Sequence, residues 1–274
     1  MFNMSTFSFH HPDPQVSIAS YNLWNNIYDN YSYIEIFSMT MIITLISEIP
    51  VFIFTFLDLL KLKCLEKYRI CYSPNSKRKY PEKKEIFKVL KYSYKSFFKI
   101  YIPIFLTGVY LCYKLNIKPY YISRELPTFS YGLFQFLSLT IFSDFLFYGL
   151  HRLFHIPYLY KNIHKFHHSY NYTFAAVHHY IHDIETLVFI LPALIPPILL
   201  NSHIVITWLY ILFIQFVGIY GHSGYVFFDC ITKYLPFMRS DYHDAHHYLF
   251  NKNFGLTWTT VDKIFGTLQI PEKY

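Results

Sequence analysis

Five long apolar runs constrain the fold of this chain more than any other feature of its sequence. A helix rises 1.5 Å per residue, so about 20 apolar residues cross the roughly 30 Å hydrocarbon core of a bilayer. The runs cover residues 34–60, 97–113, 129–150, 186–200 and 203–220. Only 15% of all residues are charged, whereas a soluble domain carries about 25%. The sequence therefore predicts an all-α integral membrane protein with about four to five membrane-embedded helices.

Polar residues and prolines inside the runs predict where the helices bend. Glu48, Pro50 and Asp58 interrupt the first run, so we expect a kink or a re-entrant shape there. Three prolines fall in the fourth run, and Asn201 and Ser202 separate it from the fifth. This last break predicts a tight hairpin.

The Lys and Arg residues are concentrated in one segment, which predicts the orientation of the chain. Residues 61–99 carry 13 of the 24 basic residues and separate the first two runs. A loop of this composition is expected on the cytoplasmic side of a membrane. The net charge of +7 would also suit nucleic acid, but no recognised binding motif accompanies it, and we expect no such partner. Counting the spans from this loop places every histidine cluster on the cytosolic side.

Thirteen of the 15 histidines lie between residues 151 and 247, and most of them form three spaced clusters. The clusters are HRLFH (His151 and His155), HKFHH (His164, His167 and His168) and DYHDAHH (His243, His246 and His247). On a helix, residues three and four apart share a face about 5–6 Å apart. That spacing allows two or three imidazoles to converge on one metal ion. Repetition of the cluster suits more than one ion, held in a helical cap beside the membrane.

The ligand types narrow the choice of metal and of reaction. Imidazole suits Zn, Cu, Fe and Ni, and the four cysteines form no CxxC pair. A structural zinc needs four ligands, fewer than the eight clustered histidines, so we expect a di-metal centre. A zinc-binding membrane hydrolase would be expected to carry HExxH, which is absent. A metal transporter would need carboxylates facing each other inside the spans, for which only Glu48, Asp58 and Asp144 qualify. Both remain alternatives.

The order and spacing of the three clusters resemble the fatty acid hydroxylase and sterol desaturase superfamily of membrane di-iron oxygenases. The resemblance covers about residues 144–268. YIHDIET (180–186) resembles the Y-x-H-P-x-E stretch, GHSGY (221–225) the HSGY of sterol-acting members, and NKNFGLTWTTVDKIFGT (251–267) the closing segment. Asp183 stands where proline is usual, and His178 and His179 form an unusual pair before His182. His178 could therefore compete as a ligand.

The resemblance implies a set of ten metal ligands and no further catalytic side chain. They are His151, His155, His164, His167, His168, His182, His222, His243, His246 and His247. The assignment of His182 and His222 as ligands rests on the resemblance more than on their spacing.

Three carboxylates are expected to support these ligands. Asp144 lies seven residues before His151, about two helical turns, and could accept the ring N–H of a ligand. Glu185 and Asp244 are similar candidates.

Residues 1–128 are then an N-terminal region with two spans and the basic loop. Residues 129–274 are the catalytic region, which forms one structural unit with those spans.

The resemblance also implies a function. It predicts hydroxylation or desaturation of a lipid, with a sterol favoured because the motifs look most like 4-methylsterol monooxygenases. A fatty acyl or alkylglycerol hydroxylase is the alternative within the superfamily. The implied cofactors are two non-haem Fe ions, O2 and electrons from NAD(P)H. The implied electron donors are cytochrome b5 and its reductase, and the implied location is the endoplasmic reticulum membrane.

Overall fold

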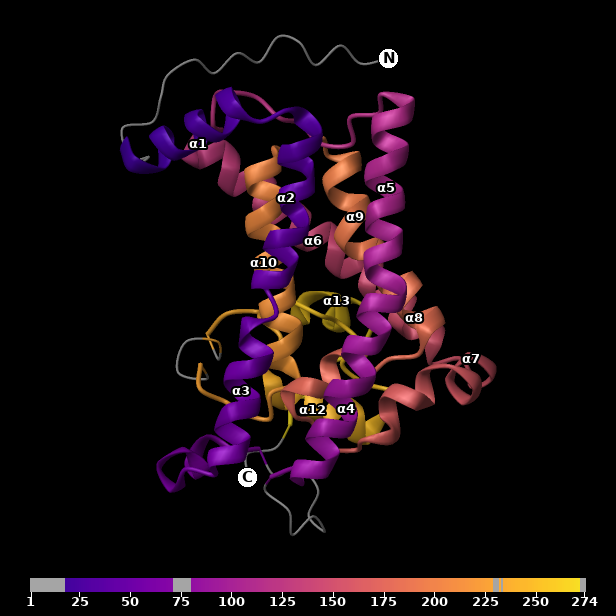
Figure 1. The fold of residues 1–274 in the computed structure, drawn as a ribbon. Coiled ribbons are helices and arrows are strands. Elements are labelled where there is room, and N and C mark those ends of the chain that lie inside the picture. The colour runs from indigo at the N-terminus through magenta and orange to yellow at the C-terminus, as the bar shows by residue number, and fades with distance from the viewer. Residues whose placement is uncertain (1–17, 71–79, 229–231, 233, 272–274) are drawn as a thin grey trace.

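A computed structural model describes residues 18–70, 80–228, 232 and 234–271. All regular secondary structure within these ranges is helical, apart from three isolated bridge contacts. The molecule is elongated, with long helices along its axis and short helices gathered at the lower end (Figure 1). The prediction of an all-α fold is confirmed.

The first span is a broken helix. The segment Tyr33–Leu60 consists of α2 (Tyr33–Ile46) and α3 (Ile49–Leu60). A capping box between Ser32 and Glu35 begins α2, which satisfies two backbone N–H groups. The break falls at residues 47–48, where Pro50 opens α3 because proline fits the first helical turn. The predicted kink is therefore present, and it buries Glu48 in the protein.

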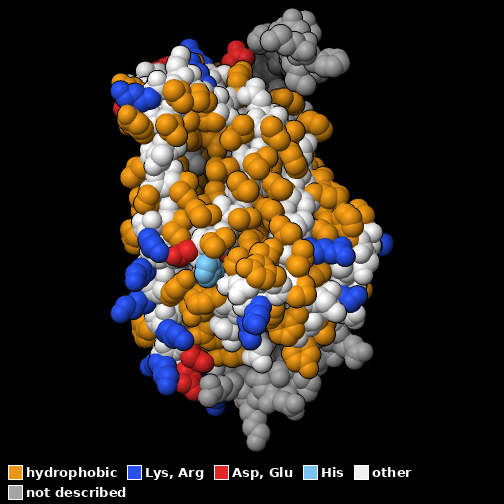
Figure 2. All heavy atoms as spheres, turned by 90° about the vertical axis from the view of Figure 1, so that its right-hand side faces the viewer, with side chains coloured by type: hydrophobic (Ala, Val, Ile, Leu, Met, Phe, Trp, Pro, Cys, Tyr) orange, Lys and Arg blue, Asp and Glu red, His pale blue; other side chains and the backbone are white. Residues whose placement is uncertain are grey.

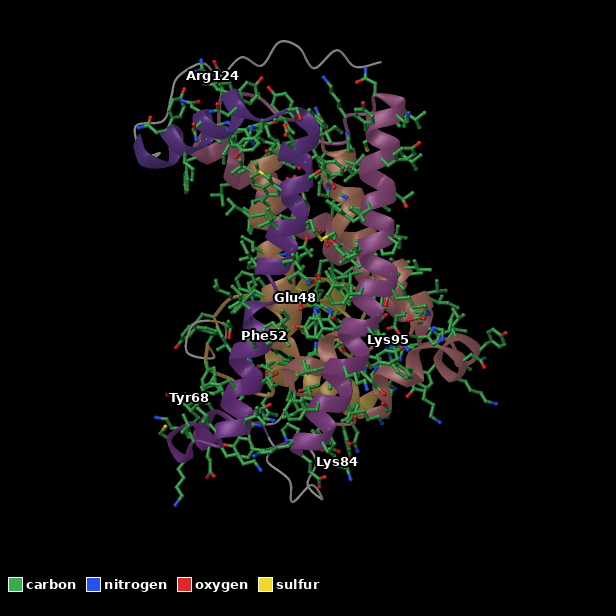
Figure 3. The ribbon with its side chains drawn as sticks, viewed as in Figure 1. Glu48, Phe52, Tyr68, Lys84, Lys95 and Arg124 are labelled. Carbon is green, nitrogen blue, oxygen red and sulfur yellow. The ribbon has the colours of Figure 1, made fainter. Side chains whose placement is uncertain are left out.

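The second span extends well beyond the apolar run that predicted it. Helix α4 (Lys83–Ser96), a π-helical turn η2 (Phe97–Tyr101) and α5 (Ile102–Leu115) form one segment, Lys83–Leu115. Ile86 and Val89 of α4 are fully buried, whereas Lys84 and Lys95 extend outward near the lower end (Figure 3). Part of the predicted basic loop is thus helical. Lys77, Arg78 and Lys79 lie outside the described residues.

Two further spans are α6 (Phe129–Phe154) and α10 (Ile204–Gly221). With the two composite segments, they give four helices that are long and apolar enough to cross a membrane, so the chain is a multi-pass membrane protein. The predicted span 186–200 is wrong as a single helix. It divides into α8 (Asp183–Phe189) and α9 (Leu191–Leu199). Pro192 lies in the first turn of α9, and a proline disrupts the helix that would precede it. The hairpin after α9 is present, with Asn201 in the left-handed region at φ 45°.

Short elements complete the fold. Helix α1 (Ile18–Asn30) lies across the upper end, where the indole of Trp24 donates to Ser123 O and Arg124 O at 3.0 Å. The other short elements are η1 (Lys63–Tyr68), α7 (Pro157–Asn162), η3 (His164–Ser169), η4 (Ala175–His179), α12 (Ser240–Leu249) and α13 (Thr259–Ile264).

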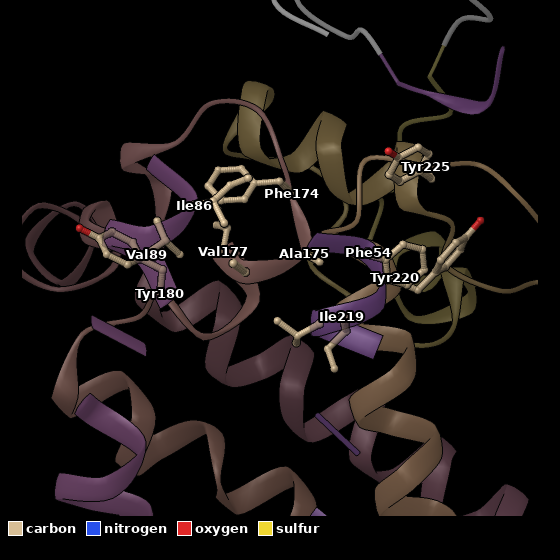
Figure 4. Close-up of a cluster of buried hydrophobic side chains, with 12 residues drawn as sticks. Phe54, Ile86, Val89, Phe174, Ala175, Val177, Tyr180, Ile219, Tyr220 and Tyr225 are labelled. Atoms are coloured by element: carbon tan, nitrogen blue, oxygen red, sulfur yellow. The ribbon is translucent and has the colours of Figure 1, made fainter. Parts of the chain in front are cut away.

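A hydrophobic core joins the lower ends of the spans to the segments that carry histidine. Phe54 of α3, Val89 of α4 and Ile219 of α10 pack around Phe174 and Val177 (Figure 4). The outer surface is also apolar. Hydrophobic side chains cover the middle of the face in Figure 2, whereas most Lys and Arg side chains on it lie in its lower half. A surface of this kind fits contact with lipid tails.

The segment after α10 is fixed to α3 by a buried polar cluster. Arg69 and Asp58 form an ion pair of 2.8 Å, and Tyr225 donates its hydroxyl to Asp58 at 2.9 Å. Arg69 also donates to Ser223 O at 2.9 Å. Gly224 lies between them with φ +72°, and a Cβ atom there would lie 2.8 Å from Arg69 Nη1. Only glycine fits this position without strain.

Replacing Gly224 by Ala is expected to lower the free energy of unfolding by about 1–3 kcal/mol, since a left-handed backbone and a close contact both oppose a side chain. The measurement is denaturant unfolding of the purified protein in detergent. Gly149→Ala is the matched control, because a Cβ atom at Gly149 meets no atom within 4 Å. Equal stability of the two variants would contradict the packing described for this loop.

Candidate metal centre

Nine buried or half-buried imidazoles meet where the spans join the short helices. Four segments carry them: the end of α6, the 3-10 helix η3, the residue after α10, and α12. The nine residues are His151, His155, His164, His167, His168, His222, His243, His246 and His247.

The nine imidazoles form two groups. The first contains His151, His155, His164, His168 and His246, and the second contains His167, His222, His243 and His247. Within each group, one nitrogen of every ring lies within 4.8 Å of the others. Both HxxHH clusters contribute to both groups. HKFHH gives two imidazoles to the first group and one to the second. DYHDAHH gives one imidazole to the first group and two to the second.

The spacing of the ring nitrogens fits a metal ion in each group. The Nε2–Nε2 separations are 3.0 Å for His164–His168, 3.2 Å for His168–His246, 3.2 Å for His167–His222 and 2.8 Å for His222–His243. Two nitrogens bound at about 2.1 Å to one ion, at a right angle, would lie about 3 Å apart. Neutral imidazoles whose lone pairs point at each other at this distance repel one another unless a cation lies between them.

The second nitrogen of most rings is held by a fixed acceptor. The Nδ1 partners are Phe254 O for His151 (2.8 Å), Tyr180 O for His167 (3.3 Å), Gly218 O for His222 (2.8 Å), Lys252 O for His246 (2.6 Å) and Tyr170 O for His247 (3.1 Å). A carbonyl can only accept, so each Nδ1 must carry the proton. Each Nε2 then keeps its lone pair for a metal ion.

Burial keeps these rings neutral. It lowers the pKa of His155 to about 2 and the pKa of His222 to about 3. The pKa values of His246 and His247 fall well below their usual range for the same reason, and neighbouring imidazoles lower them further. A neutral imidazole is the form that binds a metal.

The three predicted supporting carboxylates have different partners. Glu185 lies 2.5 Å from Nδ1 of His164, the type of contact that was expected. Asp144 instead accepts from three backbone N–H groups, at residues 256–258. Asp244 accepts from the backbone N–H and the hydroxyl of Thr173. Neither of these two touches a ligand ring, because nearby loop donors already satisfy their short side chains.

His182 is outside both groups, contrary to the expectation from the resemblance. Its backbone is extended at the start of α8, and its ring accepts from the N–H of Ile184 at 3.2 Å. His178 lies nearer, with its ring centroid 5.2 Å from that of His222. Gly218 leaves room for it, since a Cβ atom there would lie 2.4 Å from His178 Cε1.

Sequence reasoning missed one supporting residue. Asp262 accepts from the backbone N–H groups of Phe254 and Gly255 at 2.8 and 2.7 Å. It thereby fixes the carbonyl of Phe254, which orients His151. The closing motif contained this aspartate, but its spacing did not indicate the partners.

A cavity of about 230 Å³ connects the histidines with the interior of the spans. Both groups reach it, through His151 and His164 of the first and His167, His222 and His243 of the second. The rest of its lining includes aromatic and aliphatic side chains of the spans, among them Phe37, Phe105, Phe147 and Ile214. The arrangement brings an apolar molecule next to the histidine groups.

Comparison with known proteins gives consistent matches. The family model described as fatty acid hydroxylase matches residues 136–267. The chain is 31% identical to methylsterol monooxygenase 1 of Rattus norvegicus, over 90% of this chain and 82% of that protein. It is 29% identical to methylsterol monooxygenase 1 of Gallus gallus, over 93% of this chain and 84% of that protein. A putative methylsterol monooxygenase of Dictyostelium discoideum is 36% identical, but the chain spans only 53% of its length. No solved structure matches.

Replacing one imidazole of either group is expected to lower the metal content. His246→Ala and His167→Ala remove a ligand from the first and the second group respectively, so bound metal should fall from two ions per chain to one or fewer. Inductively coupled plasma mass spectrometry on purified protein measures this. His182→Ala is the control and should keep both ions. Full metal content in the first two variants would contradict the assignment of these groups.

Proposed function

The chain belongs to the fatty acid hydroxylase and sterol desaturase superfamily, and from this membership we propose that it is a membrane-bound, oxygen-dependent lipid oxidoreductase that acts on a sterol. The observation that carries the proposal is the pair of histidine groups at the end of an apolar cavity. Two iron ions bound there would supply the redox chemistry for oxidising an unactivated C–H bond with O2.

The protein's own residues bind and orient the substrate. Phenylalanine side chains from α2, α5, α6 and α8 line the cavity, and they exclude water from the reacting carbon. The carbonyl acceptors described above hold the imidazoles in place before the substrate arrives. Such preorganisation avoids rearranging the ligands during the reaction.

A sterol is favoured by the relatives, two of which are methylsterol monooxygenases that the chain covers over more than four fifths of their length. A fatty acyl or alkylglycerol substrate is the second candidate, and the description of the family model, fatty acid hydroxylase, favours the fatty acyl form. The carboxylates in the spans do not support a transporter. Glu48 is paired with His179, and Asp58 with Arg69, so they do not face each other along a path.

Electrons would come from NAD(P)H through a reductase and cytochrome b5. The exposed lysines of α4, including Lys84, Lys88 and Lys91, lie at the same end of the molecule as the histidine groups (Figures 1 and 3). A basic surface there suits an acidic donor protein.

The same end would face the cytosol, in the endoplasmic reticulum membrane. Cys64 is exposed in η1, and Cys112 lies near the far end of α5. With the other cysteines replaced by serine, a membrane-impermeant maleimide added to sealed microsomes should label Cys64 and leave Cys112 unlabelled. Labelling of Cys112 alone would reverse the orientation.

Reconstituted protein should oxidise a 4-methylsterol when NADH, cytochrome b5, its reductase and O2 are all present. Mass spectrometry of the sterol detects the added oxygen. The matched controls are reactions without O2 and with His246→Ala, both expected to give only background product. An iron-loaded protein that leaves sterols unchanged but oxidises a fatty acyl lipid would replace the sterol with the second candidate.

A further inference from the structure

One wall of the cavity is polar, although it lies between the spans. Glu48 at the break between α2 and α3, Ser93 and Tyr94 of α4, and His179 of η4 all line the cavity. Figure 3 shows Glu48 midway along the molecule, between α3 and the α4–α5 segment. Polar groups at such depth are costly unless they have partners.

Two hydroxyls in this wall have no partner. Ser93 Oγ and Tyr94 OH are buried and make no hydrogen bond to the residues that the structure describes. Tyr94 lies close to the break at Glu48, because its ring stacks on Phe52, one turn beyond Glu48, with 5.8 Å between centroids. Ser93 precedes it in α4 and lines the same cavity. Buried polar groups without a protein partner are rare, so these two hydroxyls are free to bind a molecule that enters the cavity.

Glu48 and His179 form a close pair that lines the same cavity as these hydroxyls. The Glu48 side chain is only 6% exposed; its Oε2 lies 2.9 Å from His179 Nε2, and its Oε1 accepts from Gln215 at 3.2 Å. The wall therefore offers a strong acceptor, the carboxylate, together with two hydroxyls that both donate and accept.

We infer that Glu48, Ser93, Tyr94 and His179 form a subsite that binds a hydroxyl group of the lipid substrate. The inference rests on the proposed function and assigns the residues that bind the hydroxyl of its sterol substrate. A hydroxyl can donate to the Glu48 carboxylate while it accepts from Ser93 or Tyr94. A carboxylate ligand would be repelled by Glu48, and an ester offers no donor.

The subsite lies close to the second histidine group. The ring of His179 is 4.4 Å from that of His178, and His178 is 5.2 Å from His222, measured between centroids. A hydroxyl held at Glu48 is thus separated from a metal-binding imidazole by about two rings. The two separations place His179 within about 10 Å of His222, a distance that one sterol molecule spans, so the subsite can hold the hydroxyl while the reacting carbon lies at the histidine groups.

The test compares two probes that differ only at the hydroxyl: a 4,4-dimethylsterol and its 3-deoxy analogue, which can neither donate nor accept at that carbon. Binding of each radiolabelled probe is measured on the full-length, metal-loaded protein in detergent micelles. The unmodified protein should prefer the alcohol. Tyr94→Phe and Ser93→Ala should each weaken binding of the alcohol about 3- to 10-fold, as expected for one lost hydrogen bond, and leave binding of the 3-deoxy analogue unchanged, since it has no oxygen to accept from either residue.

Tyr110→Phe, on the exposed surface of α5, is the control and should bind both probes as the unmodified protein does. Tyr94→Phe keeps the ring that packs on Phe52 and removes only the hydroxyl. If Tyr94→Phe does not fold, the result for Ser93→Ala is the test of the subsite. Equal affinity of the unmodified protein for the two probes, or equal weakening for both in the variants, would overturn the subsite. A protein that prefers the alcohol but never oxidises it would instead overturn the proposed function and leave the subsite standing.

Discussion

Repulsion between imidazole lone pairs is the constraint on which the rest of this structure depends. Within each group, neutral rings bring Nε2 atoms to 2.8–3.2 Å from one another. Protonation cannot relieve the repulsion, because burial holds the pKa values far below neutral. A bound cation relieves this repulsion. Until a cation binds, other interactions must hold the rings together. The backbone acceptors at Nδ1 do this.

Those acceptors are held in turn by contacts far along the chain. Asp144 and Asp262 bind the backbone of residues 254–258, which fixes the Phe254 carbonyl behind His151. The pair of Arg69 and Asp58 fixes the segment after His222. Charged side chains near the membrane thus serve mainly to orient loops, and the clustered imidazoles receive their geometry through those loops.

The sequence was sufficient to predict the elements whose signal is local. Apolar runs marked the four spans, Glu48 and Pro50 marked the broken helix, and the spacing of the histidine clusters identified residues that the structure brings together. The partners of Asp144 could not be predicted, because they are backbone groups more than 100 residues away. The place of His182 outside both groups could not be predicted for a related reason: a motif gives its position in the chain, but the extended backbone before α8 decides where its ring points.

The division of each HxxHH cluster between two groups has a thermodynamic consequence. The backbone of η3 and that of α12 each carry ligands for both groups. Ordering one group therefore orders most of the other, and the entropy of immobilising these segments is lost once rather than twice. Two metal ions bound at these groups would therefore enter and leave cooperatively, so that a singly loaded protein would be the least populated species during titration.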